Sequence, residues 1–270
     1  MNTTVTQAGR RAEDSDLFDK AIRVGLFSYG VQHLLIAWLA VRLAFGDSAG
    51  SASSSGALHE LAQSGLGKVS LYVVAVGFLA LIIWQGLEAA VGHHDEDGKK
   101  RIFKRLISAA KVVLYALLGV SAVKIATGSA SGGKSTDSWT ATLMQAPAGQ
   151  VLVGIVGLVI LGVGGALAYR GWKEKFRKKL DVDGNSGQDG RAYVILGKVG
   201  YISKGIAFAI VGGLFLYAAA THDADESGGL DQALQKILEQ PFGPVLLTAM
   251  AAGIACYGLF CFAWARHLKR

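Results

Sequence analysis

Six long apolar stretches, almost free of charged side chains, alternate along the chain with short polar segments. They cover residues 24–45, 69–92, 106–127, 149–169, 198–220 and 242–265. Each has the roughly 20 residues that a helix needs to cross a bilayer core of about 30 Å. Strands of a membrane barrel would instead alternate polar and apolar residues over about 10 positions. A soluble protein would need amphipathic helices to cover six such stretches, and none remain. The pattern therefore predicts an all-α polytopic membrane protein with six transmembrane helices.

The distribution of Lys and Arg predicts how these spans are oriented. Four segments, namely the two tails and the loops after the second and fourth spans, hold 20 basic residues. The three other loops hold only Lys68, Lys134 and Lys236, apart from basic residues at the span ends. Because cytoplasmic loops carry the excess of positive charge, we expect both termini to be cytoplasmic and the protein to lie in the inner or plasma membrane of the cell.

Charge and cysteine content narrow the class further. The chain has 27 Lys and Arg against 20 Asp and Glu, a formal net charge of +7 that is clustered beside the spans. This clustering is typical of membrane topology, and we expect no nucleic-acid partner. The two cysteines, Cys256 and Cys261, lie five residues apart inside one apolar stretch, which excludes a disulfide framework or a zinc cluster.

A threefold internal repeat is visible in the glycines and the outer loops. The first and fifth spans open with glycines spaced alike, at Gly25 and Gly30 and again at Gly200 and Gly205. Each outer loop ends in a short amphipathic run and a turn before the next span; the turn glycines are Gly67, Gly149 and Gly243. A unit of two spans always enters from the same side of the membrane. We therefore predict three parallel helical-hairpin repeats around a pseudo-threefold axis along the membrane normal, with short interfacial helices in the outer loops.

The chain then divides into seven segments. These are a cytoplasmic N-terminal tail (1–20), hairpin repeat one (21–94), a basic cytoplasmic loop (95–105), hairpin repeat two (106–176), a polar cytoplasmic loop (177–193), hairpin repeat three (194–267) and a basic C-terminal tail (268–270).

Two motifs of the third repeat carry a resemblance to a known family. They are Gln240-Pro241-Phe242-Gly243 and Cys256-Tyr257-Gly258-Leu259-Phe260. With the repeated glycines, they resemble the bacterial membrane family called domain of unknown function 1206, over about residues 21–267. The resemblance implies three transmembrane helix pairs and no particular chemistry. An arginine that commonly follows the aromatic in that family is replaced here, at Gln85, Leu167 and Cys261, so no role of that arginine is carried over.

Polar side chains at membrane depth are costly and are the candidates for function. These candidate intramembrane polar contacts are Gln32, His33, Gln85, Glu88, Lys111 and Lys204. His33 could relay protons or bind a ligand, or it could be a neutral imidazole bonded to a neighbouring helix. Glu88 and Lys111 lie at similar depth on consecutive spans and could form a salt bridge. Lysines near span ends could instead extend toward the interface.

Two polar segments look like metal sites and fail on inspection. Asp181, Asp183, Asn185 and Asp189 are spaced like the start of a calcium loop, but Ser186 and Ala192 stand where Gly and Glu are required. The segment from His93 to Asp97 reads better as a charged turn. We therefore expect no metal and no cofactor. Motifs of phosphate loops, hydrolases and metalloproteases are also missing, so we expect no catalytic residues and no enzymatic activity.

Two functions remain. The first is an accessory, scaffold or assembly subunit that acts through helix and lipid contacts. Its expected partners are anionic lipid at the basic cytoplasmic face and either a larger membrane complex or a second copy of the chain. The alternative is a small transporter or channel with a path along the pseudo-threefold axis. Polar side chains facing the axis on spans one, three and five would favour transport, and a packed axis of glycine and leucine would oppose it.

Overall fold

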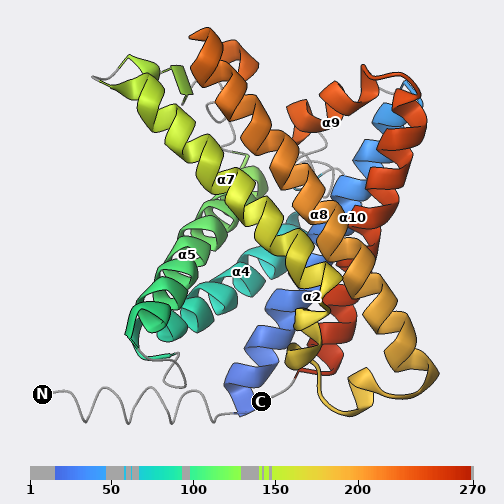
Figure 1. Cartoon of the computed structure of the whole chain (residues 1–270). Coiled ribbons are helices and arrows are strands. Elements are labelled where there is room, and N and C mark those ends of the chain that lie inside the picture. The colour runs from blue at the N-terminus through green and yellow to red at the C-terminus, as the bar shows by residue number, and fades with distance from the viewer. Residues whose placement is uncertain are drawn as a thin grey trace, which may run out of the picture.

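A computed structural model describes residues 16–46, 67–92, 98–128, 143–145 and 148–268, together with residues 58, 62, 140 and 141. Within this part the fold is all-helical, apart from one isolated bridge between Leu180 and Leu268. The six long helices are α2 (Asp16–Ala44), α4 (Gly67–Ala90), α5 (Gly98–Ala126), α7 (Gly149–Trp172), α8 (Gly187–Thr221) and α10 (Gly243–Arg266). Figure 1 shows α2, α7, α8 and α10 running from one end of the molecule to the other, with α4 and α5 side by side at one flank.

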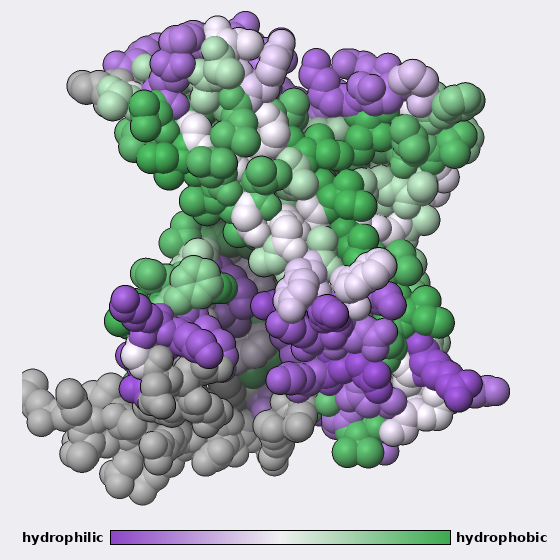
Figure 2. Space-filling model, viewed as in Figure 1, coloured by the Kyte–Doolittle hydropathy of each residue, from purple (hydrophilic) through white to green (hydrophobic). Residues whose placement is uncertain are grey.

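All six helices are long and apolar enough to cross a membrane, so this is a multi-pass membrane protein. Their large hydrophobic side chains are widely exposed: only 17% of the most apolar window of α7 is buried, and 22% of that of α5. On the face shown in Figure 2, apolar residues form a band across the middle of the molecule, and hydrophilic residues gather toward both ends. Such exposure is unfavourable in water and is normal where lipid covers the helices.

The helices pack as a chain of neighbours rather than as a closed ring. α2 lies against both α10 and α4, α10 also lies against α8, α4 against α5, and α8 against α7. α5 and α7 hardly touch one another, and in Figure 1 they diverge toward the N-terminal end of α5. The sequence pattern did not indicate this arrangement of the second repeat. Its two helices pack on the neighbouring repeats, because the close contacts of α5 and α7 are with α4 and α8.

The first and third repeats use the same contacts between their two helices. In the first, a Cβ added to Gly25 would meet the Leu81 side chain at 2.6 Å. At the corresponding place in the third, a Cβ on Gly200 would meet Tyr257 at 2.5 Å. A further pair of contacts is duplicated as well, since Gly77 leaves room for Ser28 and Gly253 leaves room for Ser203. Small residues thus let both helix pairs approach at equivalent positions.

Glycines also join one repeat to the next. α2 and α10 approach where Gly30 faces the Gly258 carbonyl, 2.9 Å from an added Cβ. α8 and α7 approach in the same way where Gly205 faces the Gly164 carbonyl, at 2.7 Å. Four of the glycines counted as repeat markers in the sequence, Gly25, Gly30, Gly200 and Gly205, are therefore points of close helix approach.

The polar loops predicted over 95–105 and 177–193 are helical in part. α5 begins at Gly98 and α8 at Gly187, so both helices extend beyond their apolar stretches. Between α7 and α8 lie two short 3-10 helices, η1 (Lys175–Lys179) and η2 (Asp183–Asn185). The apolar stretch shows how much of a helix can lie in the membrane. It does not show where the helix begins, because the first turns can be polar and lie outside the membrane. The predicted starts of these two helices were therefore too late.

The amphipathic run predicted in the third outer loop forms α9 (Leu230–Leu238), which follows the 3-10 helix η3 (Ala224–Glu226). Leu234 is fully buried, and Leu230, Ile237 and Leu238 pack against the same cluster of α2, α8 and α10 side chains. The corresponding runs of the first and second outer loops lie largely outside the described residues.

Candidate functional site

His33 of α2 and Lys204 of α8 meet inside the bundle. The Lys204 ammonium lies 3.0 Å from His33 Nε2 and donates a hydrogen bond of 2.6 Å to the Tyr29 hydroxyl. His33 is 8% exposed, and its Nδ1 lies 2.8 Å from the Tyr29 carbonyl oxygen, one turn earlier in α2. The structure thus brings two of the six predicted residues into direct contact, although 171 positions separate them in the sequence.

The direction of these hydrogen bonds defines the form of the imidazole. A carbonyl oxygen can only accept, so the bond to Tyr29 requires a hydrogen on His33 Nδ1. Lys204 carries three hydrogens and accepts none, so Nε2 is the acceptor in the second bond. With Lys204 protonated, His33 is a neutral ring that bridges the α2 backbone and a partly buried cation.

Tyrosines surround this pair. The Lys204 ammonium lies 4.2 Å from the centre of the Tyr257 ring, a distance at which a cation is attracted to the face of an aromatic ring. Tyr257 lies edge-to-face with Tyr201 and Tyr29, and Tyr29 lies edge-to-face with Tyr115 of α5. Spans one, three and five therefore all contribute polar aromatic side chains to the interior.

Glu88 and Lys111 lie close enough for the carboxylate to attract the ammonium. Arg170 and Lys204 also act on Lys111, as like charges. A direct salt bridge between Glu88 and Lys111 stays a prediction. The sequence placed both residues at similar depth on consecutive spans, and the structure adds the charges of Arg170 and Lys204 nearby.

Gln32 and Gln85, the remaining predicted residues, do not take part in these contacts. Both are buried, with exposed fractions of 2% and 5%. Within the described part of the chain, neither polar atom of the Gln32 amide has a hydrogen-bond partner, and neither does the Gln85 amide oxygen. Buried amides without partners cost free energy, and nothing in the structure explains Gln32.

Two cations of this region, Arg170 and Lys179, were predicted to be ordinary loop charges. The η1 helix turns back under the bundle, and it places the Lys179 ammonium 3.8 Å from the centre of the Trp264 ring. Arg170 lies 6.0 Å from the Tyr201 ring centre. Burial lowers the pKa of Lys179 well below its usual range, and the charges of Lys111 and Arg170 lower it further.

An apolar residue within the basic run was the signal that could have found Lys179. Phe176 is fully buried, stacked on Tyr201 at 5.4 Å and edge-to-face with Phe260 at 5.1 Å. It also fills the space that a side chain at Gly197 would need. A buried aromatic between lysines indicates a segment that packs against the bundle rather than one that is fully solvated.

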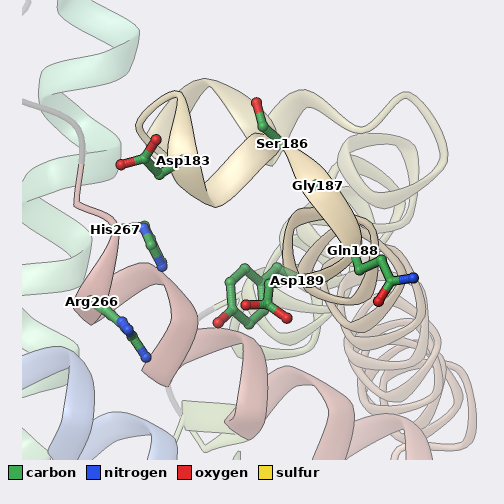
Figure 3. Close-up of a pocket in the computed structure, with 8 residues that line it drawn as sticks. Asp183, Ser186, Gly187, Gln188, Asp189, Arg266 and His267 are labelled. Carbon is green, nitrogen blue, oxygen red and sulfur yellow. The ribbon is translucent and has the colours of Figure 1, made fainter.

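The segment that begins like a calcium loop uses its oxygens within the fold. The Asp181 carboxylate accepts from the Gly184 amide at 2.7 Å and faces His267 Nδ1 at 3.2 Å. The Asn185 side-chain oxygen accepts from Arg177 at 3.2 Å. A nearby hollow of about 270 Å³ is lined by Asp183, Asp189, Arg266 and His267 among others. Figure 3 shows Asp183 and Asp189 on different elements, with His267 and Arg266 at the end of the neighbouring helix. These partners form a folded polar turn rather than the fully solvated linker that the sequence suggested.

The interior site therefore consists of cations and phenols from five helices (α2, α5, α7, α8 and α10) and η1. Its groups donate hydrogen bonds and offer positive charge, an arrangement suited to holding an anion or a hydrogen-bond acceptor. In the part of the chain that the structure describes, no three His, Cys, Asp or Glu residues are grouped as a metal site would require. The predicted histidine pair near residue 93 lies outside the described residues.

Comparison with known proteins identifies three consecutive matches to one family. The model of the Domain of Unknown Function (DUF1206) matches residues 24–92, 107–174 and 199–267. The chain is also similar to "Uncharacterized protein YxxB" of Bacillus subtilis (strain 168). The two are 28% identical over 240 residues, which cover 88% of this chain and 86% of the relative. No solved structure matches the chain.

Proposed function

Because the chain belongs to the Domain of Unknown Function (DUF1206) family, each of whose three matches spans two of the long helices, we propose that it is a non-enzymatic membrane protein acting through contacts. It serves as an accessory, scaffold or assembly subunit that binds lipid and the helices of a partner. Its site offers cations and phenols for binding, which supports a role in recognition.

The proposed architecture has three repeats around a pseudo-threefold axis, with α9 at the membrane interface. The duplicated contacts of Gly25 with Leu81 and of Gly200 with Tyr257 support equivalent first and third repeats. The positions of the basic residues support cytoplasmic termini in the inner or plasma membrane. Buried Leu234 on a short polar-faced helix supports an interfacial α9.

One observation carries the proposed role: the second repeat is open. The helices of the first and third repeats pack against each other, whereas α5 and α7 hardly touch. Among the described residues, no atom lies within 4 Å of a Cβ added to Gly162 or Gly165 of α7. Small residues on an exposed helix face allow close approach of another helix. The open second repeat is therefore the side on which a partner helix or lipid binds.

Photocrosslinking in native membranes tests this assignment. A photoreactive residue replaces Leu117 of α5 or Val163 of α7, both of which are exposed hydrophobic positions. Leu259 of α10 is the control, since it is exposed to the same extent as Val163, 43% against 42%. We expect discrete protein adducts from positions 117 and 163 and only lipid adducts from position 259.

Equal adducts from all three positions, or no protein adduct from any, would refute the assignment. A second copy of the chain as the partner would appear as an adduct carrying both tags when two tagged versions are expressed together. Purification in a mild detergent then establishes whether the crosslinked partner remains bound in fixed proportion.

A second candidate function, transport, is favoured by the polar interior. His33, Lys111 and Lys204 come from spans one, three and five and lie in one region, which is the pattern that a ligand path would use. The test is uptake or conductance in reconstituted vesicles, with thermal melting of the same sample. Saturable flux that His33→Ala abolishes without changing the melting temperature would replace the scaffold proposal. We expect no flux in either protein.

A further inference from the structure

Four cations from four elements gather at the inner end of the open second repeat. They are Lys111 of α5, Arg170 of α7, Lys179 of η1 and Lys204 of α8. Lys111, Arg170 and Lys204 all act electrostatically on Lys179, and Arg170 and Lys204 act on Lys111. Glu88 offsets the charge of Lys111. Gathering like charges in a partly buried place is unfavourable unless an anion joins them.

Trp264 gives an independent indication of a missing acceptor. Its ring is 7% exposed and lies under the Lys179 ammonium. Its indole Nε1 is buried without a hydrogen-bond partner in the described part of the chain. An indole nitrogen can only donate, so what it lacks is an acceptor. An acceptor that also carries negative charge would satisfy Trp264 and the neighbouring cations together.

The cations are held in place rather than extended into solvent. Phe176 anchors η1 against Tyr201 and Phe260, so Lys179 cannot swing away with its segment. Lys204 is fixed by Tyr29 and His33 at the inner limit of the cluster. Arg170 lies in the last turn of α7, next to the place where α7 has separated from α5. Binding then needs little rearrangement of the protein.

The few contacts between α5 and α7 leave a route toward the cluster on that side of the described residues. Figure 2 shows the surface hollowed between the two hydrophilic regions at that end of the molecule. Leu114 and Leu117 on α5 and Val163 on α7 are exposed apolar side chains. An anion with apolar tails could therefore enter sideways, with its charged group at the cations and its tails along these helices.

We propose that Lys111, Arg170, Lys179 and the Trp264 indole bind the phosphate group of an anionic membrane lipid, with Lys204 closing the inner end of the site. Arg and Lys side chains are the usual ligands of phosphate oxygens. The exposed apolar sides of α5 and α7 favour a lipid phosphate over free phosphate. This proposal rests on the proposed contact function and names the lipid class that the open repeat accepts.

The test measures bound lipid and thermal melting for the full chain. The protein is reconstituted in phosphatidylcholine vesicles with or without 20% phosphatidylglycerol, an amount on the order of that used to mimic anionic leaflets. Bound lipid is counted by native mass spectrometry. We expect one retained phosphatidylglycerol per chain, at least a tenfold loss of retention in Lys179→Met and Arg170→Met, and no loss in Lys178→Met. Lys178 is exposed in the same η1 segment, so its variant has the same net charge.

The melting temperatures distinguish a Lys179 that binds lipid from a Lys179 that only stabilises the fold. Without anionic lipid, Lys179→Met should melt above the native chain, because a buried cation is removed. With phosphatidylglycerol, only the native chain and Lys178→Met should gain stability. A lower melting temperature of Lys179→Met in both lipids, or equal lipid retention by all proteins, would overturn the proposal. So would equal losses in Lys178→Met, which would show surface attraction alone.

An arm with inorganic phosphate in pure phosphatidylcholine distinguishes the source of the anion. Saturable stabilisation by phosphate that Lys179→Met abolishes, with no lipid retained, would keep the anion site and refute the lipid assignment. Crosslinks from the exposed faces of α5 and α7 report separately on protein partners. The lipid-binding measurement can therefore refute the lipid site while the crosslinks still support the contact function. Equally, the crosslinks can refute the contact function while lipid retention still supports the lipid site.

Discussion

Two adjacent glycines of α7 have opposite surroundings, which makes them a matched pair for testing how the helices pack. A Cβ added to Gly164 would lie 2.7 Å from the Gly205 carbonyl oxygen and 2.8 Å from the Ala209 backbone nitrogen. A Cβ added to Gly165 would meet no atom within 4 Å. The contacts of Gly164 are with the α8 backbone, which cannot move aside as a flexible side chain could.

The magnitudes follow from this difference. Replacing Gly by Ala within a helix favours the helix by about 1 kcal/mol, and Gly165→Ala should gain up to that amount. Gly164→Ala gains the same term, but it also overpacks the α7–α8 contact, which typically costs about 1–3 kcal/mol. We therefore expect Gly164→Ala to be the less stable of the two by about 1–3 kcal/mol.

Thermal melting in mild detergent measures the difference. The chain carries its own probe, because Cys261 is buried and a thiol-reactive dye reports when unfolding exposes it. Gly165→Ala serves as the control for helix propensity and for expression in the membrane. If Gly164→Ala melts at or above the temperature of Gly165→Ala, then α7 and α8 do not approach at this glycine and the packing described for the repeats is wrong.

The remaining predictions concern topology, the Glu88–Lys111 pair and Lys179. In intact cells, an impermeant thiol reagent should label Glu239→Cys but not Ser186→Cys, since both sites are exposed and only the first is expected outside; labelling at position 186 would refute cytoplasmic termini. Ser227, also in the outer loop, is unsuitable because it is buried and its hydroxyl donates to the Ala224 carbonyl. Glu88→Gln should lower the free energy of unfolding by about 1–3 kcal/mol, which lies between the values typical of exposed and of buried ion pairs. Lys111→Met should lower it by less. The reason is that Lys111 is also repelled by Arg170 and Lys204; the opposite order of melting temperatures would contradict this. Because the pKa of Lys179 is lowered in the folded chain, the unfolded chain binds more protons at alkaline pH, and stability should rise as the pH increases toward the usual lysine value of about 10.4. Melting in phosphatidylcholine between about pH 7 and 10 should show this rise in the native chain and a smaller one in Lys179→Met; equal slopes would exclude Lys179 as the cause.

The spans were predictable because apolar length is a direct requirement of the bilayer. The predicted stretch at 242–265 became α10 at Gly243–Arg266, and that at 149–169 became α7 at Gly149–Trp172. The starts of α5 and α8 were not predictable in the same way. Their first turns are polar and basic, and a helix that leaves the membrane has no hydropathy boundary.

The contact partners of the polar side chains were harder to predict than the depth of those side chains in the membrane. His33 and Lys204 were identified as costly polar groups, yet their contact depends on the register of α2 against α8, which the sequence does not state. Lys179 was missed because charge density alone places it in a loop. It enters the site only because Phe176 packs beneath the bundle and turns the chain inward. The repeats predicted three equivalent hairpins, but the opening between α5 and α7 is a difference among repeats, and no periodic pattern encodes it.

On one side, the polar interior around His33 and Lys204 is bounded by tightly packed apolar side chains, and this limits how a ligand could move through the protein. Above His33 and Lys204, the side chains of Ile36, Leu39 and Leu247 form a closed apolar cluster with Leu234 of α9. Each of these is at most 2% exposed. A ligand passing between α2 and α10 would have to separate them where Gly30 and Gly258 lie in close approach. Among the described residues this cluster closes the polar interior on that side, which fits the proposed binding role better than passage along α2 and α10.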